Sequence, residues 1–200
     1  AGCTSVFLPA VGEMYQSQES LLRFDVGYFD GIMEGKFRLG HFAGVALVVS
    51  KLFNIVDPDN SYFGQKDLQQ LVLIRTLQKE LNFRTEIVNV PTKREMSGLA
   101  KSSRNERLDE SELRTAANIF KGLKLLESKI LSGVYLQNAI NEVEEFYNEI
   151  DGFELEYLEV VQTDDLITIR EYKSEIETSI CVAGYVAGVR LLDNISIYKN

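Results

Sequence analysis

The sequence is poor in the residues that mark secreted and membrane proteins. Its 200 residues include two cysteines, one histidine, three prolines and no tryptophan. Cys3 and Cys181 are too few for a disulfide framework, so we expect both to be buried thiols in the reducing cytoplasm. No apolar run reaches the roughly 18 to 20 residues that cross a bilayer, and no basic segment opens the chain. These absences predict a soluble, unexported protein.

Basic charge is also scarce. The chain has 21 Lys and Arg against 30 Asp and Glu, a net charge of −9. This balance argues against a nucleic acid or an acidic membrane as partner, because both require clustered basic residues. Residues 1–94 hold ten acidic and ten basic residues, whereas residues 95–200 hold twenty and eleven. A polyanionic ligand therefore suits the first part of the chain better.

Apolar periodicity predicts strands and helices that alternate in the first part. Residues 4–8 predict a short buried strand, and residues 41–56 predict a deeply buried helix that packs on both sides. A strand over 61–63, a helix over 67–81 and a strand over 84–90 follow. This order is typical of an open parallel sheet, in which ligands bind beyond the carboxyl ends of the strands.

The pattern changes after residue 108. Two amphipathic helices and further strands are expected over 113–130, 140–150, 153–162 and 178–197. We therefore predict two domains, residues 1–94 and residues 95–200, of which the second is a small α+β domain.

The strand end at Gly64 carries chemistry that suits phosphate, although the usual Rossmann and P-loop glycine motifs are absent. Gly64 lets a ligand approach the backbone, and Lys66 places a cation beside the amides at the start of the next helix. Asp67 is either the N-cap of that helix or a ligand contact. Gln70 lies one turn later on the same side.

The loop of residues 98–105 follows the next predicted strand. Its hydroxyls, lysine, arginine and asparagine fit either a solvated turn or a phosphate-binding loop. Two such loops at neighbouring strand ends strengthen the phosphate-site alternative, and the solvated turn stays open beside it. The lone histidine, His41, begins the predicted helix over 41–56 and is either a packed or capping imidazole or part of a site; we assign it no proton transfer.

Several segments match a known family in order and spacing across about residues 4–110. They are FRLGHFAGV at 37–45, KLFNIV at 51–56, FGQKD at 63–67, VPT at 90–92 and SSRN at 102–105. The sequence thereby resembles the pantothenate synthetases, or pantoate–β-alanine ligases. The resemblance implies the C-terminal half of a Rossmann-like, nucleotidylyl transferase-type parallel sheet domain (α/β), followed by a small α+β lid domain. By this resemblance, residues 1–94 would be a partial nucleotide- and pantoate-binding domain and residues 95–200 the lid.

The resemblance also implies an activity. Pantoate would react with ATP to a pantoyl-adenylate, and β-alanine would then displace AMP to give pantothenate. Magnesium would accompany ATP, and two copies of the chain would form a homodimer.

The resemblance further assigns roles to individual residues. Catalytic roles fall to Lys66, Ser102, Ser103 and Arg104. ATP contacts fall to these four and to Phe63, Gly64, Asp67, Val90, Lys93 and Lys101. Contacts to pantoate or β-alanine fall to Gln70, Arg38 and His41, with Val48, Val49 and Leu52 as an apolar wall.

The sequence departs from the family pattern at Leu39, Gln65, Ser97 and Lys101, where proline, glutamate, aspartate and methionine are usual. The family's His-x-Gly-His signature and its acidic magnesium-binding pair are absent as well. We therefore expect a truncated chain that does not catalyse the complete reaction alone. A non-catalytic dimerisation or binding fragment and a fold-related nucleotidyltransferase remain alternatives.

Overall fold

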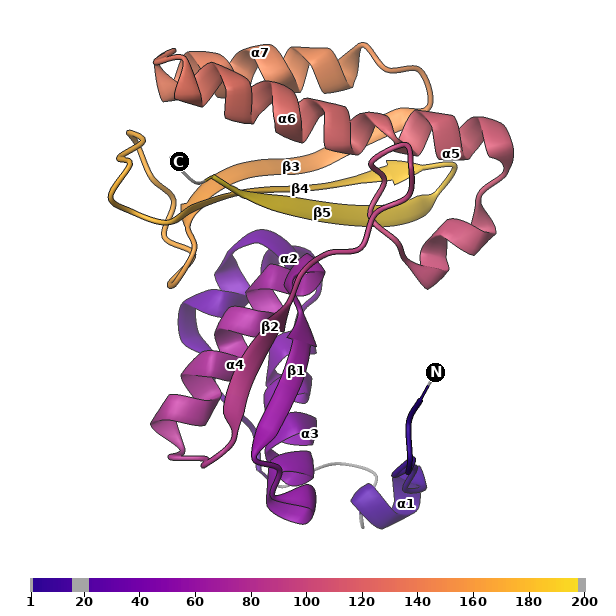
Figure 1. The fold of residues 1–200 in the computed structure, drawn as a ribbon, viewed down its shortest axis with the longest axis vertical. Coiled ribbons are helices and arrows are strands. Elements are labelled where there is room, and N and C mark those ends of the chain that lie inside the picture. The colour runs from indigo at the N-terminus through magenta and orange to yellow at the C-terminus, as the bar shows by residue number, and fades with distance from the viewer. Residues whose placement is uncertain (1, 16–21, 198–200) are drawn as a thin grey trace.

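A computed structural model describes residues 2–15 and 22–197 of the chain (Figure 1). The α-helices are α1 (Val11–Met14), α2 (Met33–Phe37), α3 (His41–Val56), α4 (Leu68–Glu80), α5 (Glu110–Ala116), α6 (Asn118–Leu131) and α7 (Leu136–Asn148). The strands are β1 (Asn60–Gly64), β2 (Glu86–Val90), β3 (Phe153–Gln162), β4 (Thr178–Val186) and β5 (Val189–Ile197). Short 3-10 helices are η1 (Gly27–Gly31), η2 (Gln65–Asp67) and η3 (Ser103–Arg107). The expected mixed α/β organisation is confirmed.

The first part, up to residue 94, is built on a parallel pair of strands. Asn60 of β1 lies opposite Glu86 of β2, and Gly64 lies opposite Val90. Helix α4 connects the two strands, as parallel pairing requires. Both strands therefore end at the same edge of the sheet, and η2 begins directly at that edge.

Helix α3 has the predicted bounds but less burial than predicted. Its buried residues form one stripe, Phe42, Ala46, Val49, Ser50 and Phe53. Their spacing of three, four and seven residues is that of a single helix face. The prediction of deep burial is wrong, because only this stripe is buried and Val45 and Val48 are partly buried. On the opposite side of the helix, Lys51 Nζ donates to the Met14 carbonyl.

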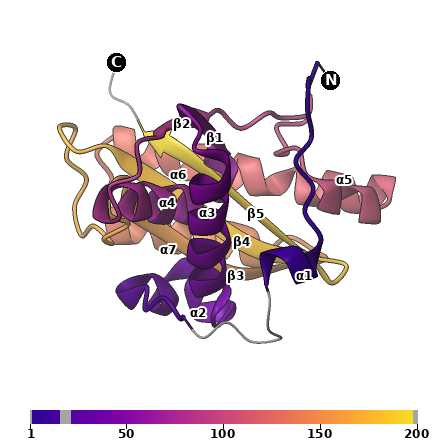
Figure 2. The ribbon, with the colours of Figure 1, turned by 90° about the horizontal axis from the view of Figure 1, so that it is seen from below.

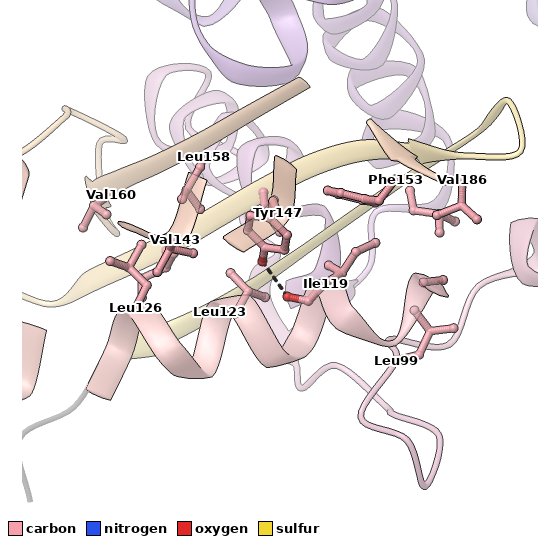
Figure 3. Packing of buried hydrophobic residues seen from close by; sticks show 14 of the residues in the cluster. Leu99, Ile119, Leu123, Leu126, Val143, Tyr147, Phe153, Leu158, Val160 and Val186 are labelled. Atoms are coloured by element: carbon pink, nitrogen blue, oxygen red, sulfur yellow. Dashed lines mark hydrogen bonds between the residues drawn. The ribbon is translucent and has the colours of Figure 1, made fainter. Parts of the chain in front are cut away.

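The second part, from residue 95, contains an antiparallel sheet in the order β3–β4–β5. Ala187 and Gly188, both with positive φ, join β4 to β5. Such a pair of residues suits a two-residue hairpin turn. Helices α6 and α7 cover one face of the sheet, and their core is centred on the fully buried Tyr147, whose hydroxyl donates to the Ile119 carbonyl at 2.7 Å (Figure 3).

The other face of this sheet lies against the first part (Figures 1 and 2). A shared apolar cluster joins Phe42, Leu68 and Val72 of the first part to Val161 and Cys181 of the second. The two parts are therefore packed together through side chains as well as linked by the chain.

Three local predictions fail. Residues 4–8 form no strand and are exposed, since no described strand lies beside them. Cys3 is exposed, whereas Cys181 is buried as expected. The single helix predicted over 113–130 is divided at Ala117 into α5 and α6. Among the described residues, no helix is long and apolar enough to span a membrane.

Candidate functional site

A cavity of about 240 Å³ lies where the two parts meet. From the first part its walls include Glu34, Arg38, His41, Lys66, Asp67 and Gln70. From the second part they include Tyr157, Cys181, Asp193 and Asn194. The cavity thus brings cations, carboxylates and carboxamides from three separated stretches of the sequence to one place.

Lys66 lies on η2, directly after β1. Its ammonium donates to the backbone carbonyls of Lys101 at 3.3 Å and Ala100 at 3.5 Å. Burial lowers the pKa of Lys66, and the neighbouring Asp193 opposes that shift. The lysine therefore joins the two predicted loops and is partly desolvated, a state in which a cation interacts strongly with an anion.

The loop of residues 101–105 is folded back towards β2. The Lys101 amide donates to the Lys93 carbonyl at 2.9 Å, and Asn105 Nδ2 donates to the Ala100 carbonyl at 3.1 Å. The Ser102 hydroxyl accepts from the Arg104 amide at 3.2 Å and so caps η3. A second, open hollow beside this loop is lined by Lys101, Ser102 and Ser103. Three of the residues predicted to bind phosphate therefore line one hollow, whereas the side chain of Arg104 lies elsewhere, with Nη1 donating to the Arg190 carbonyl at 3.3 Å.

Asp67 was predicted to be either the N-cap of α4 or a ligand contact, and the structure decides only part of this question. Asp67 occupies the N-cap position of α4, but its side chain makes no capping hydrogen bond. Its carboxylate instead contributes to the cavity wall. The next glutamine, Gln69, is buried and donates to the carbonyls of Phe29 and Ile32 at 2.9 and 3.1 Å. Both glutamines line the cavity, but these hydrogen bonds give Gln69 a structural role.

A buried ionic cluster closes one side of the cavity. Arg190 of β5 donates to Glu34 of α2 through Nη1 at 2.6 Å and Nη2 at 2.8 Å, and to Glu156 through Nε at 2.9 Å. Tyr157 also donates to Glu34, at 3.0 Å. Burial acts to lower the pKa of Arg190, but its hydrogen bonds to the two glutamates raise that pKa above the ordinary value. The cluster holds α2 against the sheet of the second part.

His41 and Arg38 lie at the α2–α3 end of the cavity. Burial lowers the pKa of His41 below 6.5, and the charge of Arg38 acts in the same direction. Arg38 Nη1 lies 3.9 Å from Glu34 Oε2. Burial thus favours the neutral imidazole, and the partly exposed Arg38 contributes a cation to this end of the cavity.

Other predicted residues lie outside the cavity. Phe63 packs in the cluster between α3 and α4, where its ring centroid lies 6.4 Å from that of Phe53. Val48 and Val49 belong to the same cluster, and Leu52 is likewise absent from the cavity wall. The remaining residues with predicted ATP roles, Gly64, Val90 and Lys93, lie at or just after the ends of the two parallel strands.

The sequence reasoning missed several residues of this cavity: Glu34, Tyr157, Asp193 and Asn194. One signal was available for two of them. Asp193 and Asn194 interrupt an apolar strand, and buried polar residues in such a strand require partners. The described residues contain no group of three or more His, Cys, Asp or Glu that could hold a metal ion.

Comparison with known proteins identifies the family of the chain. A profile of the Pantoate-beta-alanine ligase family matches residues 1–196. The pantothenate synthetase of Cytophaga hutchinsonii is 46% identical over 98% of this chain and 70% of its own length. That of Bacteroides thetaiotaomicron is 39% identical over 99% of this chain and 69% of its own length.

Solved structures give the same result. The crystal structure of pantothenate synthetase from Thermus thermophilus superposes with a TM-score of 0.87 at 35% identity, over 96% of this chain and 68% of that one. Pantoate-beta-alanine ligase from Francisella tularensis, crystallised with a β,γ-ATP compound and β-alanine, has a TM-score of 0.67 at 32% identity, over 92% and 61%.

The match thus extends over nearly the whole chain and about 70% of the first relative's length. It rests on sequence and on fold independently. The chain belongs to the pantoate–β-alanine ligase family, whose matched members are pantothenate synthetases, which are ATP-dependent ligases.

Proposed function

We propose that the cavity and the adjoining loop bind ATP and pantoate for the formation of pantothenate. The observation that carries the proposal is the contact of Lys66 with the backbone of residues 100 and 101, beside a cavity lined by Arg38, His41 and Gln70. A cation and a carboxamide in one cavity, with a hydroxyl loop at the neighbouring hollow, suit a triphosphate and a small hydroxy acid.

The reaction has two steps. A pantoate carboxylate oxygen attacks the α-phosphorus of ATP, and the bond to the β-phosphate breaks to release pyrophosphate. The amine of β-alanine then attacks the acyl carbon, loses a proton, and displaces AMP. Lys66 offsets negative charge that shifts onto the phosphates, and its partial desolvation strengthens that effect. Ser102, Ser103 and Arg104 bind phosphate oxygens.

The proposed contacts of the other residues follow from where each residue lies in the structure. Gly64, Asp67, Val90, Lys93 and Lys101 contact the nucleotide from the ends of β1 and β2, and Phe63 supports them from the cluster below. Gln70, Arg38 and His41 hold pantoate or β-alanine by hydrogen bonds and charge. Val48, Val49 and Leu52 form the apolar support of that end. Magnesium arrives on the phosphates of ATP.

The two parts of the chain have different roles in this proposal. The first part, residues 1–94, carries the nucleotide site as half of a Rossmann-like sheet, and the second, residues 95–200, acts as its lid. A cytoplasmic location fits the free thiols of Cys3 and Cys181. Exposed apolar residues near the N-terminus, such as Val6 and Leu8, support a homodimer, for which sedimentation should give the mass of two chains.

Because the chain lacks the family's His-x-Gly-His signature, the test uses a longer protein that contains this signature upstream of Ala1. In that protein, pantoate-dependent exchange of label between pyrophosphate and ATP tests the proposal. The Lys66→Ala variant should lose about 100-fold or more of the exchange rate, the range seen when a group that stabilises transition-state charge is removed. Lys79→Ala, an exposed lysine on α4, is the matched control and should retain the full rate. Equal rates in both variants, or exchange without pantoate, would contradict the assignment.

A further inference from the structure

Strand β5 reaches across the interface to the backbone of the Lys66 turn. Asn194 Nδ2 donates to the Gln65 carbonyl at 2.9 Å and to the Lys66 carbonyl at 2.8 Å. Only the amide nitrogen can donate, so two carbonyl acceptors fix the orientation of this side chain. One asparagine of the second part thus ties down the turn that carries the lysine of the first.

Asn194 is itself held rigidly. Its backbone amide donates to Asp193 Oδ1 at 2.8 Å, and its carbonyl accepts from Arg94 Nη2 at 3.0 Å. Arg94 also pairs with Asp193, with Nη1 2.5 Å from Oδ2, and its guanidinium lies 4.2 Å from the Phe120 ring centroid. Asp193 and Asn194 are only 2% and 4% exposed.

The contacts form one continuous path. Arg94 lies on the segment that connects the two parts, Asp193 and Asn194 lie on β5, and Lys66 lies at the end of β1. The ammonium of Lys66 returns to the carbonyls of residues 100 and 101 on the connecting segment. A change in the placement of β5 would therefore move the backbone that carries Lys66.

We propose that Asn194 is a positioning residue that couples the placement of the second part to that of Lys66. The inference rests on the proposed function of Lys66 in phosphate binding. Asn194 acts through the turn, because its donor groups are used by the carbonyls of Gln65 and Lys66.

Calorimetric titration with magnesium ATP tests the positioning role. Asn194→Ala should weaken ATP binding about tenfold, since two buried hydrogen bonds are lost. The ATP affinity of Asn194→Ser should lie between that of the unsubstituted chain and that of Asn194→Ala. The Lys66→Ala, Asn194→Ala double variant should bind no more weakly than Lys66→Ala alone, because both changes disable one group. Asn54→Ala, an exposed asparagine on α3, is the matched control.

Spin labels test the coupling without any ligand. Labels at Glu80→Cys on α4 and Ser128→Cys on α6, in a Cys3→Ser background, report the distance between the two parts by pulsed electron resonance. The distance distribution should be narrow in the chain with Asn194 and broader with Asn194→Ala. Circular dichroism checks that each variant is folded, and Asn194→Ser replaces Asn194→Ala if the latter is not.

The outcomes separate the two claims. If Lys66→Ala weakens ATP binding but Asn194→Ala does not, or if the two losses add, the positioning role is wrong and the proposed function stands. If Lys66→Ala has no effect on ATP binding, the proposed function is contradicted. In that case only the spin-label distances test whether Asn194 couples the two parts. A distance distribution that is unchanged by Asn194→Ala would overturn the coupling.

Discussion

The two parts of the molecule differ in how completely they are packed. In the second part, α6 and α7 cover the sheet and leave residues such as Leu123, Val143 and Ile180 with no exposed surface. In the first part, the two strands are half exposed and α3 buries one stripe. Most residues with predicted ligand roles belong to the less packed part. A rigid support thus lies against a site whose polar groups remain accessible to ligands.

The largest effect is expected where the two parts join. Arg190→Met should lower the free energy of unfolding by about 3–5 kcal/mol, because Glu34 and Glu156 would remain buried without their cation. Urea denaturation measures the change. Arg170→Met removes an exposed arginine and should change stability by about 0.5 kcal/mol or less. Equal losses in the two variants would show that the cluster does not hold the parts together.

A pair of helix glycines compares the packing of the two parts directly. A Cβ at Gly122 of α6 would lie 2.2 Å from Tyr147 Cζ, whereas one at Gly44 of α3 would meet no atom within 4 Å. Gly122→Ala should therefore lower the free energy of unfolding by about 1–3 kcal/mol. Gly44→Ala should raise it by about 0.5–1 kcal/mol through helix propensity. Denaturation curves that shift in the same direction would contradict the difference in packing.

The smallest effect concerns His41, the only histidine of the chain. Burial and Arg38 lower its pKa, so an NMR titration of the imidazole should have its midpoint below 6.5. Arg38→Ala should raise that midpoint. Because the unfolded state binds the proton more readily, this residue's contribution to stability is present above pH 6.5 and falls as the pH decreases towards the folded-state pKa. A midpoint at or above 6.5 would contradict a desolvated imidazole.

Local patterns predicted the elements around the site well. The helix at α4 and the strand at β2 lie within about three residues of their predicted bounds, because apolar periodicity and Pro91 are read from adjacent residues. The meeting of Lys66 with residues 100 and 101 also follows from topology, since parallel strands end at one edge.

Burial was harder to predict than periodicity. Residues 4–8 are apolar but exposed, and α3 is buried on one side only, because burial depends on what lies beside an element. Likewise, Asn194 contacts Lys66 across 128 positions of the chain. No pattern within β5 names that partner, and only the packing of the sheet against the first part reveals it.

The acceptors of the Lys66 ammonium have a further consequence. Both are neutral backbone carbonyls, at 3.3 and 3.5 Å, which are long for a charged donor. A phosphate oxygen would make a shorter and stronger bond, so a ligand bound as proposed would displace weak partners. Within residues 2–15 and 22–197, no carboxylate forms an ion pair with this ammonium that the ligand would have to break. The same carbonyls keep the side chain extended towards the loop of residues 101–105. Lys66 is therefore held in place by contacts that an anion can readily replace.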